Sequence, residues 1–186
     1  FILAGDSDKA VNRSICFNPH GDVVARYDKI HLFDVTLSRK EVWKESNVYD
    51  GGNRAVMTKA GDAKIALSIC YDLRFPHLYR SYGQAGAHII TVPAAFTKPT
   101  GEAHWQTLLR ARAIETGSFI MAPAQGGLHE DGRTTFGHSL IIGPWGDIIA
   151  ELDHDKPGIL LADINLNEVD EARRKIPAWN HNPNFT

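Results

Sequence analysis

The sequence has few cysteines and no long apolar run, and both shortages narrow what the chain can be. Two cysteines among 186 residues cannot build a disulfide framework, which favours a reducing, cytoplasmic setting. No apolar segment approaches the roughly 20 residues that a membrane-spanning helix needs. The count of two cysteines still allows a single disulfide bridge between Cys16 and Cys70.

An excess of charge of either sign is also missing. The 20 Lys and Arg residues against 22 Asp and Glu residues give a formal net charge of -2, which offers no electrostatic case for nucleic acid or an anionic membrane surface. The chain has no dinucleotide fingerprint or phosphate-cradling loop, and His129-Glu130 is not followed by a second histidine at zinc-ligand spacing. We therefore expect no metal or nucleotide cofactor and no nucleic-acid or membrane partner.

Apolar segments alternate with turn residues along the chain, which predicts a mixed sheet with helices packed against it. The length suits one domain, taken here as residues 1–186. Residues 13–27 are expected to form a hairpin, and residues 31–53 are expected to be irregular. Helices are predicted at residues 76–84, 105–116 and 165–175, and further strands at residues 63–69, 88–93, 119–124, 138–142, 148–152 and 159–164.

The most informative segment is Ile65-Ala-Leu-Ser-Ile-Cys-Tyr-Asp-Leu-Arg-Phe-Pro76. A short apolar strand delivers Cys70 to the point where polar and turn-forming residues begin. A thiol held there can be aimed at a substrate, and the N–H groups that follow can face a developing negative charge. The competing interpretation is a small apolar core residue, which is how we interpret Cys16 in its predicted strand.

Two charged residues upstream of this segment are candidates to assist a thiol nucleophile. Lys29 follows a predicted strand and is flanked by Tyr27 and Ile30, so its ammonium could be partly desolvated and stabilise an oxyanion. Glu45 could fix that lysine in place and hold it charged. The simpler alternative is that both are solvated surface groups. A Cys–His mechanism instead needs one of His31, His77 and His104 beside the thiol.

A series of short motifs runs from one end of the chain to the other. Through these motifs, which stand in family order, the chain resembles the carbon–nitrogen hydrolase (nitrilase-like) superfamily, in particular its amidase branches. The motifs are Tyr27-Asp-Lys-Ile-His-Leu-Phe-Asp34, Glu45-Ser46, Cys70-Tyr-Asp-Leu-Arg-Phe-Pro76, Pro93-Ala-Ala-Phe96, Thr100-Gly-Glu-Ala-His-Trp105, Arg110-Ala-Arg-Ala-Ile-Glu115, Gly137-His-Ser139 and Pro144-Trp-Gly146.

The resemblance implies an α/β fold, an α-β-β-α sandwich, with a Glu–Lys–Cys site and assembly into homodimers or larger homo-oligomers. Lys29 matches the family's lysine, Cys70 its nucleophile and Glu45 its supporting second glutamate. In such enzymes the thiolate attacks an amide carbonyl, the amine leaves as ammonia, and water hydrolyses the thioester.

The resemblance also places a substrate beside four residues that follow the nucleophile or the next strand, namely Tyr71, Arg74, Phe96 and Thr97. The Arg74 guanidinium suits a substrate carboxylate, and the equal alternative is an ion pair with Asp72. Residues 100–127 look most like deaminated glutathione amidases, with the omega-amidases that act on alpha-keto acid amides as the close second. We expect Arg110, Arg112 and Glu115 to form a structural ion-pair set.

Two departures from the family pattern stand out. The family's first catalytic glutamate lies in an N-terminal portion that this sequence does not contain, and the sequence begins in an apparent strand at Phe1. We expect a fragment of an active protein, because the other site residues are intact; the alternative is a truncated, catalytically silent subunit. The second departure is His77, where the family usually has glutamate.

Overall fold

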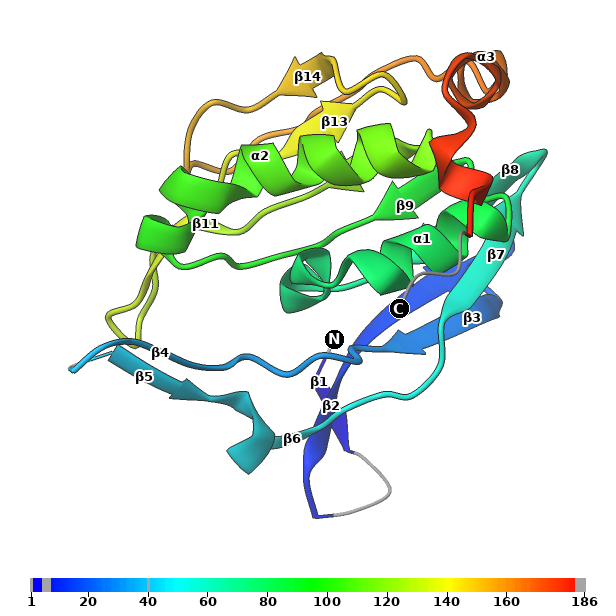
Figure 1. The fold of residues 1–186 in the computed structure, drawn as a ribbon. Coiled ribbons are helices and arrows are strands. Elements are labelled where there is room, and N and C mark those ends of the chain that lie inside the picture. Colours follow the sequence, from blue (N-terminus) through cyan, green and yellow to red (C-terminus); the bar gives the residue numbers. More distant parts are fainter. Residues whose placement is uncertain (1, 5–7, 40, 183–186) are drawn as a thin grey trace.

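The computed structural model describes residues 2–4, 8–39 and 41–182 (Figure 1). Its largest element is a six-stranded sheet of mixed direction. In the order of the sheet, the strands are β14 (Ile148–Glu151), β13 (Leu140–Ile142), β10 (Phe119–Ala122), β9 (Ile89–Thr91), β8 (Ala63–Leu67) and β7 (Val56–Ala60). The three central strands β8, β9 and β10 are parallel, and the outer pairings are antiparallel.

One face of this sheet is covered by helices. Ala66, Ile90, Ile120 and Ile142 are cross-strand partners on four neighbouring strands and are all 0% exposed. They belong to the core cluster that includes residues of α1 (Pro76–Gln84) and α2 (Lys98–Thr116). Figure 1 shows both helices lying across this face. Because side chains alternate along a strand, the residues next to these four in the sequence point to the opposite face of the sheet.

A smaller sheet packs on that opposite face. It contains β1 (Ile2–Ala4), β2 (Ala10–Phe17), β3 (Val23–Asp28) and β6 (Tyr49–Asp50). The buried Tyr27 of β3 clusters with Leu67 and Ile69 at the end of β8. Further along the same face, Val169 of α3 (Asn167–Lys175) packs against Ile89 and Phe119. The described residues thus form layers of helices, one sheet and a second sheet, the mixed α/β arrangement predicted from the sequence.

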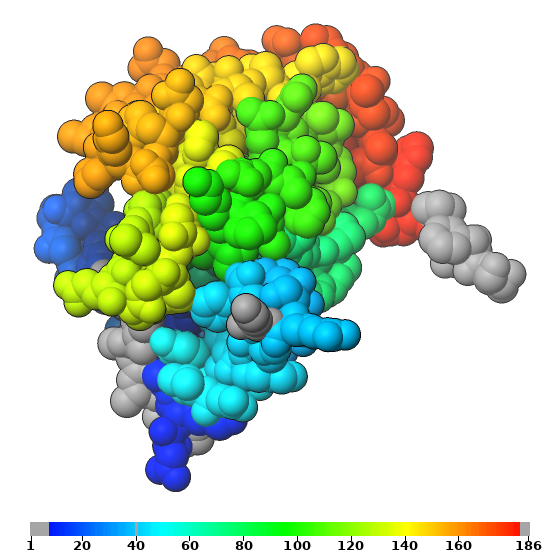
Figure 2. Space-filling model, turned by 90° about the vertical axis from the view of Figure 1, so that its left-hand side faces the viewer, coloured from blue at the N-terminus to red at the C-terminus, as the bar shows by residue number. Residues whose placement is uncertain are grey.

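Two short hairpins extend beyond the sheet on the same side, at the left of Figure 1. The first joins β4 (Asp34–Ser38) to β5 (Glu41–Lys44), and the second joins β11 (Gly126–Leu128) to β12 (Thr134–Phe136). Three 3-10 helices complete the described elements: η1 (Glu45–Asn47), η2 (Cys70–Arg74) and η3 (Pro177–Asn180). Figure 2 looks onto this side and shows the cyan β4–β5 hairpin beside the yellow-green β11–β12 hairpin.

Several sequence predictions need correction. Residues 159–164 are not a strand, because the apolar side chains of Ile159 and Leu161 are 85% and 83% exposed and the segment has no ladder partner among the described strands. The helix expected from Trp105 begins seven residues earlier, at Lys98. Residues 31–53 hold β4, β5 and β6 rather than irregular chain, and β7 was not predicted.

Other expectations are met in the described residues. Both cysteines are free thiols, so the bridge that counting left open is not formed. The predicted turn at residues 143–146 joins β13 to β14, with the Gly146 N–H donating to the Gly143 carbonyl. None of the described helices combines the length and the apolar character that crossing a membrane requires.

Candidate active site

Cys70 lies where the carboxyl ends of the three parallel strands come together. Its backbone N–H donates a 2.9 Å hydrogen bond to the carbonyl of Pro93, just after β9, and Ala94 in turn bridges to Ala124 just after β10. In open α/β sheets, ligands bind at this edge of the parallel strands. The short strand β8 therefore places the thiol at the expected edge.

The backbone at Cys70 makes an abrupt change of direction. Ile69 is extended, with φ -139° and ψ 120°, and the 3-10 turn of η2 begins at the next residue. Cys70 itself has φ +49°, a left-handed conformation that a residue with a Cβ adopts at a cost. Such strain persists only where the surroundings hold it, and it is concentrated at functional sites.

Asp72 stabilises this turn through several hydrogen bonds. Its buried carboxylate accepts hydrogen bonds from the Ile69 N–H at 2.9 Å, the Tyr27 hydroxyl at 2.6 Å and the His31 N–H at 3.0 Å. The His31 ring nitrogen Nδ1 lies 2.8 Å from the same carboxylate. Buried carboxylates need such partners, and here the partners tie the turn at Cys70 to the segment that carries Lys29.

Lys29 and Glu45 form a buried ion pair beside this turn. Lys29 is 3% exposed, and its Nζ lies 2.5 Å from Oε2 of Glu45. The same oxygen accepts a 2.6 Å hydrogen bond from the backbone N–H of Phe33. The carboxylate is thus fixed by η1 on one side and by the backbone before β4 on the other, which leaves the lysine little freedom to move. This is the pairing that the sequence predicted.

The electrostatic surroundings of the Cys70 thiol combine opposing influences. Burial raises the pKa of the thiol, and the charges of Glu45 and Asp72 also raise this pKa. The Lys29 ammonium and the backbone N–H of Ala95, which points at the sulfur, lower the pKa. Lys29 and Ala95 are also the kind of donors that can meet a developing oxyanion.

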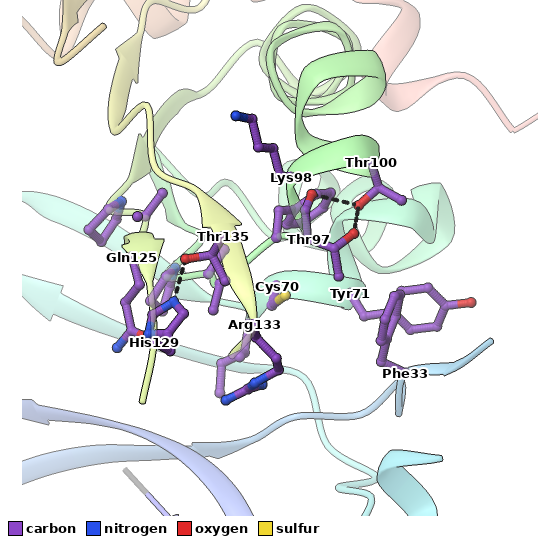
Figure 3. Close-up of a pocket in the computed structure, with 18 of the residues that line it drawn as sticks. Phe33, Cys70, Tyr71, Thr97, Lys98, Thr100, Gln125, His129, Arg133 and Thr135 are labelled. Carbon is purple, nitrogen blue, oxygen red and sulfur yellow. Dashed lines mark hydrogen bonds between the residues drawn. The ribbon is translucent and has the colours of Figure 1, made fainter. Parts of the chain in front are cut away.

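A hollow of about 1490 Å³ opens over these residues. Cys70, Lys29 and Glu45 line it, as do the four residues expected at the substrate, Tyr71, Arg74, Phe96 and Thr97. Figure 3 places Cys70 at the centre of the view, with Phe33 and Tyr71 on one side and His129 and Thr135 on the other. All seven predicted site residues therefore face one pocket.

Arg74 does not pair with Asp72, so that alternative is wrong. Its Nη1 lies 3.2 Å from Nδ1 of His104 on α2, and its guanidinium lies 5.3 Å from the centre of the Phe96 ring. Burial lowers the pKa of Arg74. Among the described residues no carboxylate forms an ion pair with it. A half-buried guanidinium of this kind is suited to an acidic ligand.

The histidines named for a Cys–His mechanism have other contacts. His31 bonds to Asp72 and stacks on Phe75, and His104 contacts Arg74. His77 meets the His31 ring edge-on, with centroids 5.5 Å apart. Among the described residues, no hydrogen bond joins an imidazole to the Cys70 thiol, and the positive charge that lowers the pKa of this thiol is that of Lys29.

The expected ion-pair set on α2 is found only in part. Arg112 Nη1 lies 3.0 Å from Glu115 Oε1, and its Nε donates to the carbonyl of Leu73 in η2. Arg110 instead donates to the carbonyl of Gly146. These contacts are structural, since they attach α2 to the turn after Cys70 and to the β13–β14 connection. Within the described part of the chain, no group of His, Cys, Asp and Glu could hold a metal ion.

Sequence reasoning missed several residues of the pocket. The role of Asp72 as the acceptor for Tyr27 and His31 was not predicted, although its position two residues after Cys70 was a usable signal. The backbone N–H of Ala95 carries no side-chain signal at all. Arg133 also lines the pocket, and it lies in a segment that the sequence did not assign to any element.

Comparisons with known proteins show which family the sequence matches. Residues 2–174 match the family model described as carbon–nitrogen hydrolase. A deaminated glutathione amidase of Synechocystis is 43% identical over 183 residues, covering 97% of this chain and 67% of that protein. The deaminated glutathione amidase of Dictyostelium discoideum is 44% identical over 181 residues, covering 97% of this chain and 62% of that protein. The chain thus spans about two thirds of the length of these relatives.

Solved structures are similar as well. The crystal structure of the C. elegans NitFhit protein superposes with a TM-score of 0.89 at 36% identity, covering 97% of this chain and 44% of that one. A variant of the amidase from Nesterenkonia sp. AN1, with acrylamide added at its active-site cysteine, has a TM-score of 0.74 at 26% identity and covers 95% of this chain and 66% of that one. The chain belongs to the carbon–nitrogen hydrolase family.

Proposed function

We propose that the chain provides the nucleophile, the oxyanion site and the substrate pocket of an amidase that hydrolyses a small carboxylate-bearing amide through a thioester on Cys70. The observation that carries this proposal is the convergence of the Lys29 ammonium and the Ala95 N–H on the Cys70 thiol. A nucleophile with oxyanion donors beside it is what acyl transfer requires.

In the proposed reaction, the Cys70 thiolate attacks the amide carbonyl carbon and forms a C–S bond. The carbonyl electron pair moves onto oxygen, where Lys29 and the Ala95 N–H stabilise the negative charge. When the pair returns, the C–N bond breaks and the amine leaves with a proton, as ammonia if the amide is primary. Water then adds to the thioester carbonyl, the C–S bond breaks, the acid is released, and the Cys70 thiol is restored.

Glu45 acts in this scheme on Lys29 rather than on the substrate. Its carboxylate holds the ammonium at 2.5 Å and is itself fixed by the Phe33 N–H. This pairing keeps the Lys29 side chain oriented toward the oxyanion before the reaction begins. The resemblance to the family assigns proton transfer to another glutamate and not to Glu45.

For the substrate, we propose deaminated glutathione, because the curated relatives bear that name and Arg74 lines the pocket without a carboxylate partner among the described residues. Arg74 would bind the carboxylate of the acyl part, and Tyr71, Phe96 and Thr97 would line the space around it. An omega-amide of an alpha-keto acid offers the same acyl group, and it is the second candidate.

The test uses the full-length protein and measures release of the alpha-keto acid from deaminated glutathione and from alpha-ketoglutaramate. Cys70→Ala should abolish release and leave the free energy of unfolding close to its original value, while Cys16→Ala serves as the matched control that removes the other thiol. Continued acid release by the Cys70→Ala protein would contradict the thioester mechanism. If the unmodified full-length protein releases no acid from either amide, the proposed substrates are wrong and the silent-subunit alternative is favoured.

A further inference from the structure

The pocket around Cys70 is more positively charged than the chain as a whole. Seven Lys or Arg side chains line it against three Asp or Glu side chains, although the formal net charge of the chain is -2. Lys29, Arg13 and Arg133 are ion-paired with Glu45, Asp28 and Asp131. The remaining positive charge favours a substrate that carries more than one negative group.

Arg133 is held at this pocket by a well-defined loop. It directly precedes β12, and its carbonyl accepts a 2.8 Å hydrogen bond from the His129 N–H across the turn. The Arg133 N–H and Nε both donate to the carboxylate of Asp131, at 3.0 and 2.5 Å. The backbone and the base of the guanidinium are therefore fixed, which lowers the entropic cost of using the outer nitrogens to bind a ligand.

The outer part of the same guanidinium lies over an aromatic ring from the other hairpin. Its Cζ is 5.7 Å from the centre of the Trp43 ring on β5, and the Trp43 indole N–H donates to Glu41 at 3.2 Å. Stacking leaves the edge of a guanidinium available for hydrogen bonds. Among the described residues, no hydrogen bond is made by the two Nη atoms of Arg133.

Arg74 and Arg133 approach the pocket from different parts of the fold. Arg74 belongs to η2 and contacts α2 through His104, whereas Arg133 belongs to the β11–β12 hairpin and contacts β5 through Trp43. In Figure 3 the Arg133 side chain extends away from Lys98, Thr97 and Thr100, the residues at the start of α2. Because the two guanidinium groups are anchored on separate elements, each can bind an acidic group of its own.

We propose that Arg133 binds a second carboxylate, carried by the amine that leaves when the amide bond is cleaved. This inference rests on the proposed function, in which Arg74 binds the carboxylate of the acyl part. The substrate class is then an amide with an acidic group on each side of the scissile bond. Deaminated glutathione belongs to this class because its peptide portion ends in a carboxylate, and alpha-ketoglutaramate does not because its leaving amine is ammonia.

The first test compares kcat/KM for these two amides in the full-length protein. Arg133→Ala should lower the ratio of kcat/KM for deaminated glutathione to that for alpha-ketoglutaramate by roughly 10- to 100-fold, the range expected for a charge-assisted hydrogen bond. The loss should appear mainly in KM. Arg26→Ala, which removes an exposed arginine of β3 that does not line the pocket, is the matched control. A ratio within about twofold of the original value would overturn the proposal.

A second test separates a binding role from a merely structural contact between the two hairpins. It uses deaminated glutathione whose terminal carboxylate is capped as an amide. If Arg133 binds that carboxylate, capping and Arg133→Ala should weaken the substrate to a similar extent and should not add together. If Arg133 only attaches one hairpin to the other through Trp43, Arg133→Ala should lower kcat/KM equally for the capped and the uncapped substrate. That result would contradict the proposal.

A binding measurement keeps this inference separate from the proposed reaction. In the Cys70→Ala background, titration calorimetry should show that Arg133→Ala weakens deaminated glutathione by roughly 10- to 100-fold. If binding depends on Arg133 but the protein with Cys70 intact hydrolyses no amide, only the proposed function is contradicted. Turnover of deaminated glutathione with Arg133-independent binding would contradict the carboxylate site alone.

Discussion

The hydroxyl of Tyr27 donates a 2.6 Å hydrogen bond to Oδ2 of Asp72, and the two residues are 45 positions apart in the chain. Tyr27 lies two residues before Lys29 in the sequence, and Asp72 lies two residues after Cys70. Both side chains are 0% exposed. This one contact therefore joins the segment that carries the ammonium to the turn that carries the thiol.

Removing this hydroxyl should affect both stability and chemistry. Tyr27→Phe leaves the buried Asp72 carboxylate with one donor fewer, and we expect the free energy of unfolding to fall by about 1–3 kcal/mol. We also expect a lower kcat, because the turn at Cys70 and the Lys29 segment are then less tightly held relative to each other. Urea denaturation and steady-state kinetics on the full-length protein measure the two effects.

Tyr49→Phe is a suitable control for the stability measurement. Tyr49 is a half-buried tyrosine of β6, and its hydroxyl makes no side-chain hydrogen bond among the described residues. Its replacement should change the free energy of unfolding by less than about 0.5 kcal/mol. Equal stabilities for the Tyr27 and Tyr49 variants would mean that the Asp72 contact contributes little.

The reactivity of the Cys70 thiol should depend on pH in opposite ways in two variants. The thiolate is the reactive form, and burial raises the pKa of Cys70 while Lys29 lowers this pKa and Glu45 raises it. Lys29→Met should therefore move the rise of alkylation rate to higher pH. Glu45→Gln, which keeps the size of the side chain, should move the rise to lower pH because it removes a negative charge.

The measurement is the rate of iodoacetamide alkylation at Cys70 from pH 6 to 10, followed by peptide mass spectrometry in a Cys16→Ser background. The same shifts should appear in the acidic limb of kcat/KM against pH, since that limb reports the free protein. Two shifts in the same direction would show that the charges of Lys29 and Glu45 do not act on the thiol as the geometry indicates.

The central part of the site could be predicted from the sequence because it depends on local patterns. A short apolar strand before Cys70 and polar residues after it place the thiol at a strand end, and this position is found in the structure. Lys29 and Glu45 were named from their neighbours and from motif order, and they form an ion pair at 2.5 Å. Both features involve side chains with recognisable chemistry in a recognisable context.

What the sequence could not give depends on contacts between distant segments. The strand expected at residues 159–164 has suitable apolar residues but no ladder partner among the described strands, and apolar composition does not report whether a partner exists. The start of α2 was placed too late because Pro99 and Gly101 weaken its helical pattern. Pro is acceptable in the first helical turn, and Gly101 has a reason in packing that only the fold reveals.

Gly101 lies in α2 where the helix meets β12, and this contact gives the last prediction. A Cβ placed on Gly101 would lie 2.3 Å from the Cβ of Phe136, whose ring stacks on His138 at 4.0 Å. Alanine normally stabilises a helix relative to glycine by up to about 1 kcal/mol. Here the overlap should outweigh that gain, so Gly101→Ala should lower the free energy of unfolding by about 1–3 kcal/mol. Gln106→Ala, at an exposed position of the same helix, is the control for propensity alone, and urea denaturation compares them. A Gly101→Ala protein more stable than the original would show that β12 yields to the methyl group and that the hairpin carrying Arg133 is not fixed by α2.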